Sequence, residues 1–227
     1  MNSALLHSTL QSVRDDDAGA IEKAIAEGVD LGPVWLGRHT LLMTAAGGGY
    51  INALRALLPS SNAKIADDKG RTALMMAAKR GCPDCVGMLL AASDPQAQDK
   101  EGKDALFYAL RSDMSRGYKA KRACLQMLAE RIDASRPQGA HESPRSVLWL
   151  AASKHQSSPE TFEIFGPQWP QSEEAAQAIA QWGPQQLPLT HAALERALLA
   201  QAMGEAASAQ ETAPQAKSAA KAESRRL

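Results

Sequence analysis

The residues whose types and spacing could carry out chemistry lie in one stretch, Cys82-Pro83-Asp84-Cys85. Two cysteines separated by two residues can act as a redox pair or supply half of a zinc site. The remaining cysteine, Cys124, stands alone, and the sequence has no second Cys-x-x-Cys or Cys-x-x-His motif to complete four zinc ligands. We therefore interpret the cysteines as small buried side chains. A thiol- or metal-dependent enzyme that uses Cys82 and Cys85 is the alternative.

Other residue types common in active sites form no recognisable arrangement. Three glycines at 47–49 lack the Lys-Ser/Thr of a phosphate-binding loop, and three aspartates at 15–17 are interpreted as a solvated turn that places negative charge at the start of the next helix. The five histidines have no carboxylate or cysteine at ligand spacing: His7, His39, His141, His155 and His191. We predict no catalytic residue, no cofactor and no metal ion, and we expect that the chain is not an enzyme.

The composition limits the class of protein. Of the 227 residues, 44% are hydrophobic and 22% are charged, which is typical of a folded globular chain. The 25 basic residues balance the 25 acidic ones, so neither nucleic acid nor a membrane is an expected partner. Three cysteines cannot build a disulfide framework, and we expect a cytoplasmic protein. The abundance of alanine and the 4% aromatic content favour closely packed helices over β-sheets.

Internal repetition shows which elements position these residues. Residues 39–58 align with residues 71–90 at a spacing of 32, a third copy begins at 103, and a weaker fourth copy covers residues 146–153. Five of the coinciding pairs are Thr40/Thr72, Leu42/Leu74, Ala45/Ala77, Gly49/Gly81 and Leu57/Leu89. These residues resemble the ankyrin repeat, whose signature is Gly-x-Thr-Pro-Leu-His-x-Ala-Ala followed by glycine and an apolar second helix. The resemblance implies an all-α ankyrin-repeat solenoid of stacked helix-turn-helix units with short finger loops or hairpins.

The repeated positions also have a direct physical interpretation. The hydroxyl or carboxylate groups of Thr40, Thr72, Asp104 and Ser146 can cap the first helix of each unit, and Gly49 and Gly81 can end those helices in the left-handed conformation. A second helix is expected at residues 83–92, with proline in its first turn. Polar turns are expected at 67–70 and 99–102. The inward positions predicted to be buried are Leu42, Ala46, Leu57, Leu74, Ala78, Val86, Leu89, Leu106, Leu125, Leu128 and Leu148.

The domain organisation follows from where the repeat pattern is regular. We expect a degenerate N-terminal capping helix pair at 1–35, repeats at 36–166, a C-terminal helical cap at 167–203 and a disordered tail at 204–227. The repeats divide at about 36–66, 67–98, 99–142 and 143–166. The third repeat carries about seven extra residues within the basic segment 112–122, and its second helix is expected to resume at Cys124. Cys85 and Cys124 then occupy equivalent positions, too far apart for a disulfide.

The resemblance implies a non-enzymatic module that binds a protein partner through its concave face and fingers. The predicted binding residues are Asp68, Lys69, Met76, Lys79, Arg80, Lys100, Lys103, Tyr108 and Arg111. Two alternatives stay open: Met76 and Tyr108 pack between helices, or the partner binds the basic segment at 116–122. The composition is typical of bacterial chains, for which the resemblance suggests either a housekeeping or immunity-type inhibitor inside the producing cell or an effector delivered into a host cell by a specialised secretion system. We expect a monomer.

Overall fold

The computed structural model describes residues 3–31, 35–36, 38–112, 117–133, 137–138, 145–146 and 164–165, together with Glu195 and Leu199. The chain divides into two compact units, residues 1–164 and 165–227, and the description below concerns the first. Several predictions lie outside the described residues: the helices of the fourth repeat with Leu148, the helical cap at 167–203 apart from Glu195 and Leu199, and the tail at 204–227. The domain boundaries proposed above stay predictions.

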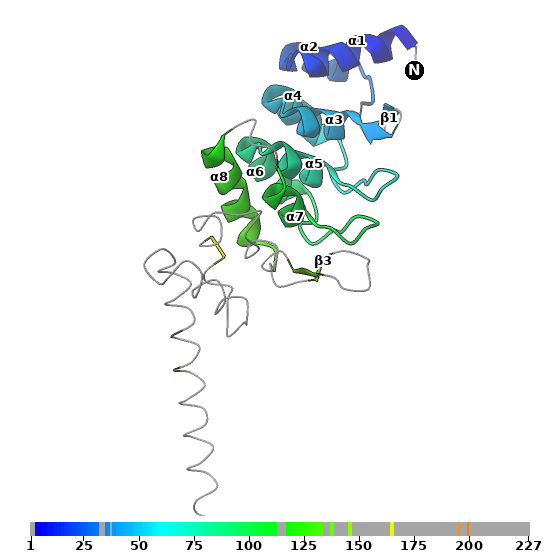
Figure 1. Ribbon diagram of the computed structural model, residues 1–227. Helices are drawn as coiled ribbons and strands as arrows, with labels where there is room; N and C mark the ends of the chain where they lie inside the picture. The colour runs from blue at the N-terminus through cyan, green and yellow to red at the C-terminus, as the bar shows by residue number, and fades with distance from the viewer. Residues whose placement is uncertain are drawn as a thin grey trace, which may run out of the picture. The chain divides into compact units, whose positions relative to one another are not determined.

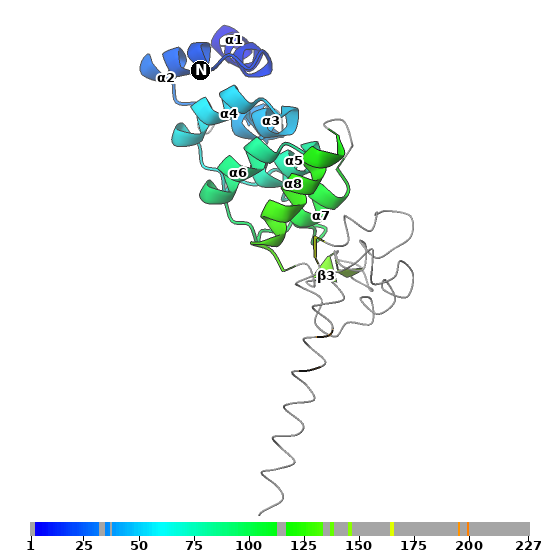
Figure 2. The same ribbon diagram turned by 90° about the vertical axis from the view of Figure 1, so that its left-hand side faces the viewer.

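Within the described residues, eight α-helices form consecutive pairs, and the pairs stack in chain order from α1 to α8 (Figures 1 and 2). The odd-numbered helices pack in one row and the even-numbered helices in a second row beside it, on the left in Figure 1. Their bounds are α1 Ser3–Arg14, α2 Ala18–Ala26, α3 Leu41–Gly48, α4 Ile51–Leu57, α5 Ala73–Arg80, α6 Pro83–Ala92, α7 Ala105–Leu110 and α8 Tyr118–Ala129. A 3₁₀ turn, η1 Leu58–Ser60, follows α4.

Short hairpin-like projections, called fingers here, connect the pairs and extend on the side of the odd-numbered row (Figure 1). Finger 1 pairs strands β1 Trp35–Leu36 and β2 His39–Thr40 in antiparallel fashion. Finger 2 comprises residues 66–72 and is closed by a bridge between Ala66 and Thr72. Finger 3 comprises residues 98–104, and strands β3 Pro137–Gln138 and β4 Arg145–Ser146 pair beyond α8. The described residues thus contain only two-stranded pairs, and the all-α solenoid is confirmed.

Each odd-numbered helix from α3 to α7 begins at the predicted cap. The side-chain oxygen of the capping residue accepts a hydrogen bond from the backbone amide three residues later, which satisfies one of the free N–H groups of the first turn. The caps and distances are Thr40 to Met43 N at 3.2 Å, Thr72 to Met75 N at 3.4 Å, and Asp104 to Phe107 N at 2.9 Å. Gly49 and Gly81 end α3 and α5 with φ of 71° and 68°, as predicted.

The core lies between the two rows of helices. Of the eleven positions predicted to be buried, Leu148 is outside the described residues and the other ten are at most 2% exposed. Small side chains such as Ala46 and Ala78 face neighbouring helices, which permits close approach of the stacked units. Cys85 and Cys124 are both fully buried and form no disulfide, in agreement with the prediction that they stay reduced.

The prediction for the start of the second helix in the third repeat was wrong. This helix, α8, begins at Tyr118 and not at Cys124, so residues 118–122 of the basic segment are helical. Alanine, lysine and arginine have high helix propensity, and the helix extends over them before its apolar stripe begins. This helix has 12 residues, against the 10 of α6 in the preceding repeat, and α7 ends at Leu110.

The interpretation of the three aspartates holds for one of them and is wrong for another. Asp17 caps α2 as expected, because its carboxylate accepts from Ala20 N at 3.0 Å. Asp16 instead reaches the next helix pair, where it accepts from Ala53 N at 2.8 Å and from Asn52 Nδ2 at 3.1 Å. The N-cap residue of α4, Tyr50, makes no side-chain capping bond, so Asp16 satisfies the start of α4 from outside the repeat.

Candidate protein-binding surface

Two buried aspartates at the repeat spacing of 32 build the middle fingers. In finger 2, Asp67 Oδ1 accepts from the amides of Lys69 at 2.9 Å and Arg71 at 2.8 Å. In finger 3, Asp99 Oδ1 accepts from the amides at the two corresponding positions, Glu101 and Lys103, each at 2.9 Å. Asp67 is 6% exposed and Asp99 is 8% exposed, so each finger folds around a buried hydrogen-bond acceptor.

The second oxygen of each carboxylate has a different partner. Asp67 Oδ2 accepts from Arg71 Nε at 2.9 Å and lies 2.7 Å from Arg71 Nη2. Burial by itself raises the pKa of Asp67, but the hydrogen bonds from the Arg71 side chain and from the finger amides outweigh it, and the pKa is lowered. Asp99 Oδ2 accepts from the Tyr108 hydroxyl at 2.6 Å. Burial, together with this bond to Asp99, raises the pKa of Tyr108, so its hydroxyl stays protonated as a donor.

Adjacent fingers are bonded to one another. The Lys100 amide donates to the Lys69 carbonyl at 2.9 Å, which joins the tips of fingers 2 and 3 through the main chain. Gly70 permits this approach: its φ is 81°, and a Cβ atom there would lie 2.8 Å from Lys100 N. Arg38 of finger 1 lies 3.7 Å from Asp68 of finger 2, an exposed ion pair that adds little stability.

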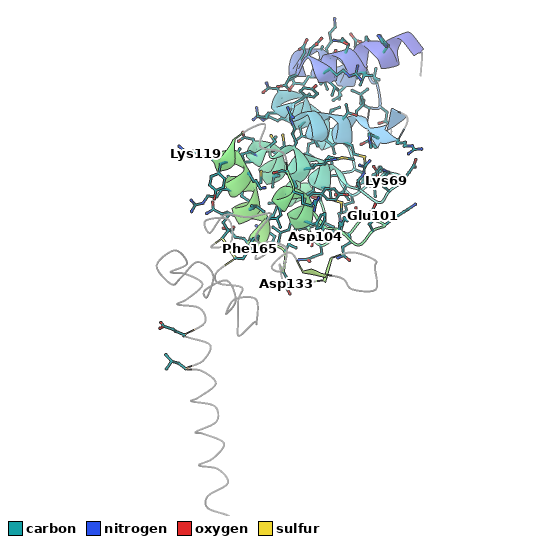
Figure 3. The ribbon with its side chains drawn as sticks, in the orientation of Figure 1. Lys69, Glu101, Asp104, Lys119, Asp133 and Phe165 are labelled. Atoms are coloured by element: carbon teal, nitrogen blue, oxygen red, sulfur yellow. The ribbon has the colours of Figure 1, made fainter. Side chains whose placement is uncertain are left out.

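The predicted binding residues divide into an exposed group and a half-buried group. The tips of fingers 2 and 3 are exposed, and Figure 3 labels one residue of each, Lys69 and Glu101. The predicted residues that are exposed are Asp68, Lys69, Lys79, Lys100 and Arg111. Those that are half-buried are Met76, Arg80, Lys103 and Tyr108.

An aromatic cluster on α7 joins finger 3 to the end of that helix. Lys103 Nζ lies 5.3 Å and Arg111 Cζ 5.8 Å from the ring centroid of Phe107, and Lys103 also pairs with Glu101. Tyr108 meets Phe107 edge-on, with centroids 6.0 Å apart. The structure thus brings Lys103, Tyr108 and Arg111 together, and it uses the Tyr108 hydroxyl to hold Asp99.

The Cys-x-x-Cys stretch is a helix start. Cys82 is the N-cap of α6, its Sγ accepts from Cys85 N at 3.4 Å, and Pro83 occupies the first turn. Both thiols are fully buried, which supports the interpretation of these cysteines as packing residues. No group of three or more histidine, cysteine or acidic side chains that could hold a metal ion occurs in the described part of the chain.

The sequence prediction omitted several residues that shape this surface. Asp67 and Asp99 were assigned only to polar turns, although their recurrence after 32 residues, immediately before the exposed tips, was visible in the sequence. Phe107, whose ring lies under Lys103 and Arg111, was not singled out. The pair of Arg38 with Asp68 joins two fingers and has no local signal in the sequence, whereas the pair of Arg71 with Asp67 spans four residues and was missed.

Comparison with known families agrees with this architecture. A family model described as ankyrin repeats (3 copies) matches residues 10–99 and 42–138, which together cover more than half of the chain. The chain therefore belongs to the ankyrin-repeat family, whose members generally act as protein–protein interaction modules and are typically non-enzymatic. No curated protein matched the sequence. In the residues that the structure describes, no helix has the length and apolar character needed to cross a membrane.

Proposed function

We propose that this chain is a non-enzymatic module that binds the acidic surface of a protein partner through fingers 1 to 3 and the odd-numbered helices. The observation that carries the proposal is the fixed presentation of the finger tips. Buried carboxylates hold the main chain of fingers 2 and 3, and the bond from Lys100 to Lys69 couples the two tips. A surface ordered before binding loses less conformational entropy when a partner docks.

The charge of this surface supports an acidic partner. Within the described fingers and odd-numbered row from α3 to α7, five cations are exposed against two anions, Asp68 and Glu101. The exposed cations are Arg38, Lys69, Lys79, Lys100 and Arg111. Such an imbalance attracts an acidic surface at long range and orients it during encounter. The zero net charge of the whole chain argues against nucleic acid as the partner.

The biological setting of the proposal rests on the composition. Three buried cysteines that form no disulfide fit a reducing compartment, so we place the protein in the cytoplasm, with delivery into a host cell as the alternative. We further propose that it acts as a monomer. The two roles that fit a binding module with these properties are an immunity-type inhibitor and an effector.

The experiment is affinity capture from a lysate of the source organism, quantified by mass spectrometry, with the wild-type chain and two charge-reversed variants. The first variant, Lys69→Glu with Lys100→Glu, reverses the finger tips. The matched control, Arg55→Glu with Lys119→Glu, makes the same charge change on exposed residues of the even-numbered row. We expect one protein to be captured equally by the wild type and the control. The captured amount of that protein should be at least about tenfold lower with the finger variant. Equal retention by all three chains would refute the proposal.

A further inference from the structure

Fingers 1 and 2 are joined differently from fingers 2 and 3. Fingers 2 and 3 share the main-chain bond from Lys100 to Lys69, which involves no titratable group. In the residues that the structure describes, no main-chain hydrogen bond joins fingers 1 and 2, and two pairs of side chains connect them. One of these pairs, Arg38 with Asp68, is exposed and adds little stability. The connection therefore depends more on the second pair, which contains a buried carboxylate.

This second pair consists of His39 in finger 1 and Asp67 in finger 2. His39 Nδ1 lies 3.4 Å from Asp67 Oδ2, and the side chain of Asp67 is 1% exposed. The Nδ1 atom is itself buried and makes no hydrogen bond within the described part of the chain. The histidine side chain is 38% exposed, so protons from the solvent reach the ring. The buried side of the ring thus faces a carboxylate, and its other side can exchange protons with water.

The charge of the imidazole ring determines how strong this contact is. In one neutral form, Nδ1 turns a lone pair toward a negatively charged oxygen. In the other neutral form, its N–H group meets the oxygen at a distance beyond the usual range of about 2.7–3.2 Å. A protonated ring adds a full positive charge, which a buried carboxylate attracts strongly. Histidine is the residue type that changes charge between about pH 5 and 8, so the contact depends on pH in that range.

The charged groups around His39 leave it as the one that titrates in this range. Burial raises the pKa of Asp67, but the hydrogen bonds from Arg71 and the finger amides outweigh it, so the carboxylate stays ionised. Arg71 Nη2 lies 2.7 Å from the same Asp67 oxygen and opposes a second cation there, but its charge does not change with pH. Neither residues 32–37 nor α3 contains a titratable side chain. The other charged residues of fingers 1 and 2 are Arg38, Asp68 and Lys69.

The repeat register shows what is unusual about His39. His39, Arg71 and Lys103 follow one another at the spacing of 32, so each repeat places a basic residue directly before the cap of its first helix. Arg71 and Lys103 keep their charge at neutral pH, and each pairs with an acidic residue of its own finger, Asp67 or Glu101. His39 instead contacts an acidic residue of the next finger, and its charge depends on pH.

We propose that protonation of His39 fastens finger 1 to finger 2 through Asp67, so that finger 1 is held at mildly acidic pH and is held less tightly at mildly alkaline pH. The contact lies within the chain and is tested without a partner, so the inference does not depend on the proposed function. Its consequence for binding does rest on that function: the contact sets the pH at which Arg38 of finger 1 is fixed beside fingers 2 and 3.

The test is a double-mutant cycle on the full chain, made of the wild type, His39→Gln, Asp67→Asn and the chain with both substitutions. Urea denaturation followed by circular dichroism gives the equilibrium constant of unfolding at about pH 5.5 and about pH 8. The coupling is the factor by which Asp67→Asn reduces the effect of His39→Gln on that constant. The matched control is a cycle with His7→Gln in place of His39→Gln, because His7 is an exposed histidine on α1.

We expect the coupling between positions 39 and 67 to be at least about threefold larger at about pH 5.5 than at about pH 8. The sign follows because the folded contact favours the protonated ring, so its stabilisation is present at low pH and is lost as the pH rises. The coupling in the His7→Gln cycle should differ by less than about twofold between the two pH values. A smaller than threefold change for His39→Gln, or an equally large change for His7→Gln, would overturn the proposal.

Discussion

At the scale of single residues, the molecule depends on carboxylates that are buried inside turns. Asp67 and Asp99 occupy the same position in consecutive repeats and accept the same pair of backbone amides. A charged acceptor forms stronger hydrogen bonds than a neutral one, and burial shields these bonds from water. The exposed lysines beside them are therefore carried on a main chain that the aspartates fix.

Replacement of Asp67 by asparagine tests this role through its pH dependence. Asp67→Asn should lower the free energy of unfolding at pH 7 by about 2 kcal/mol, because the carboxylate bonds to Arg71 are lost. The pKa of Asp67 is lower in the folded chain than in the unfolded one, so the unfolded chain takes up the proton first as the pH falls. The stabilisation is thus complete above about pH 5 and disappears as the pH falls through the folded pKa, below about 4.

Urea denaturation followed by circular dichroism at several pH values measures this difference. The control is Asp68→Asn, because Asp68 is exposed and its ion pair with Arg38 is worth about 0–1 kcal/mol. A difference between wild type and Asp67→Asn that stayed constant from about pH 7 to below about pH 4 would contradict the role assigned to the carboxylate.

At the scale of elements, the contact between fingers 2 and 3 depends on a glycine. Gly70→Ala introduces two costs: left-handed backbone strain at φ 81° and a clash with Lys100 N. Gly28→Ala introduces the strain alone, since Gly28 has φ 83° and no atom within 4 Å of the added Cβ. We expect Gly70→Ala to destabilise the chain by about 1 kcal/mol or more beyond Gly28→Ala, as measured by thermal unfolding. An equal loss of stability in the two variants would show that the contact between fingers 2 and 3 contributes nothing to the stability of the chain.

The N-terminal helix pair is attached to the next pair through Asp16. Asp16→Ala should destabilise the chain by about 1–2 kcal/mol, because the start of α4 loses its acceptor and alanine disfavours the φ of 55° at this position. Asp16→Asn keeps an acceptor and tolerates that conformation, so most of the stability should remain. Hydrogen exchange of the Ala53 amide provides the measurement, with faster exchange expected only in Asp16→Ala. Unchanged exchange in both variants would rule out the capping role.

The sequence predicted features that depend on local periodicity and missed those that depend on stacking. Capping residues, glycine helix ends and the helix α6 at Pro83–Ala92 follow from neighbours within a few positions, and all were predicted. The bond from Lys100 to Lys69 and the bond from Ala53 to Asp16 join residues more than 30 positions apart. Such contacts depend on how one unit stacks on the next. The early start of α8 was missed because its first residues are polar, although their helix propensity was a usable signal.

At the scale of the whole molecule, each helix pair among the described residues packs most closely against its neighbours along the stack. Such a stack makes an extended surface in which every repeat contributes one finger and one odd-numbered helix. The family assignment gives the general role of protein binding, and the charge of this surface gives the proposed character of the partner. Fold by itself does not identify a partner, so the location of the binding surface is the central claim to test.

Site-specific photo-cross-linking tests that claim most directly. A photoreactive amino acid is placed in the full chain at Met76 or Lys100 on the proposed surface, and at Arg55 or Lys119 on the opposite row of helices. We predict that one and the same protein becomes cross-linked at Met76 and at Lys100, and that Arg55 and Lys119 give no cross-link to it. Cross-linking of a protein at Arg55 or Lys119, with no protein cross-linked at both Met76 and Lys100, would contradict the account.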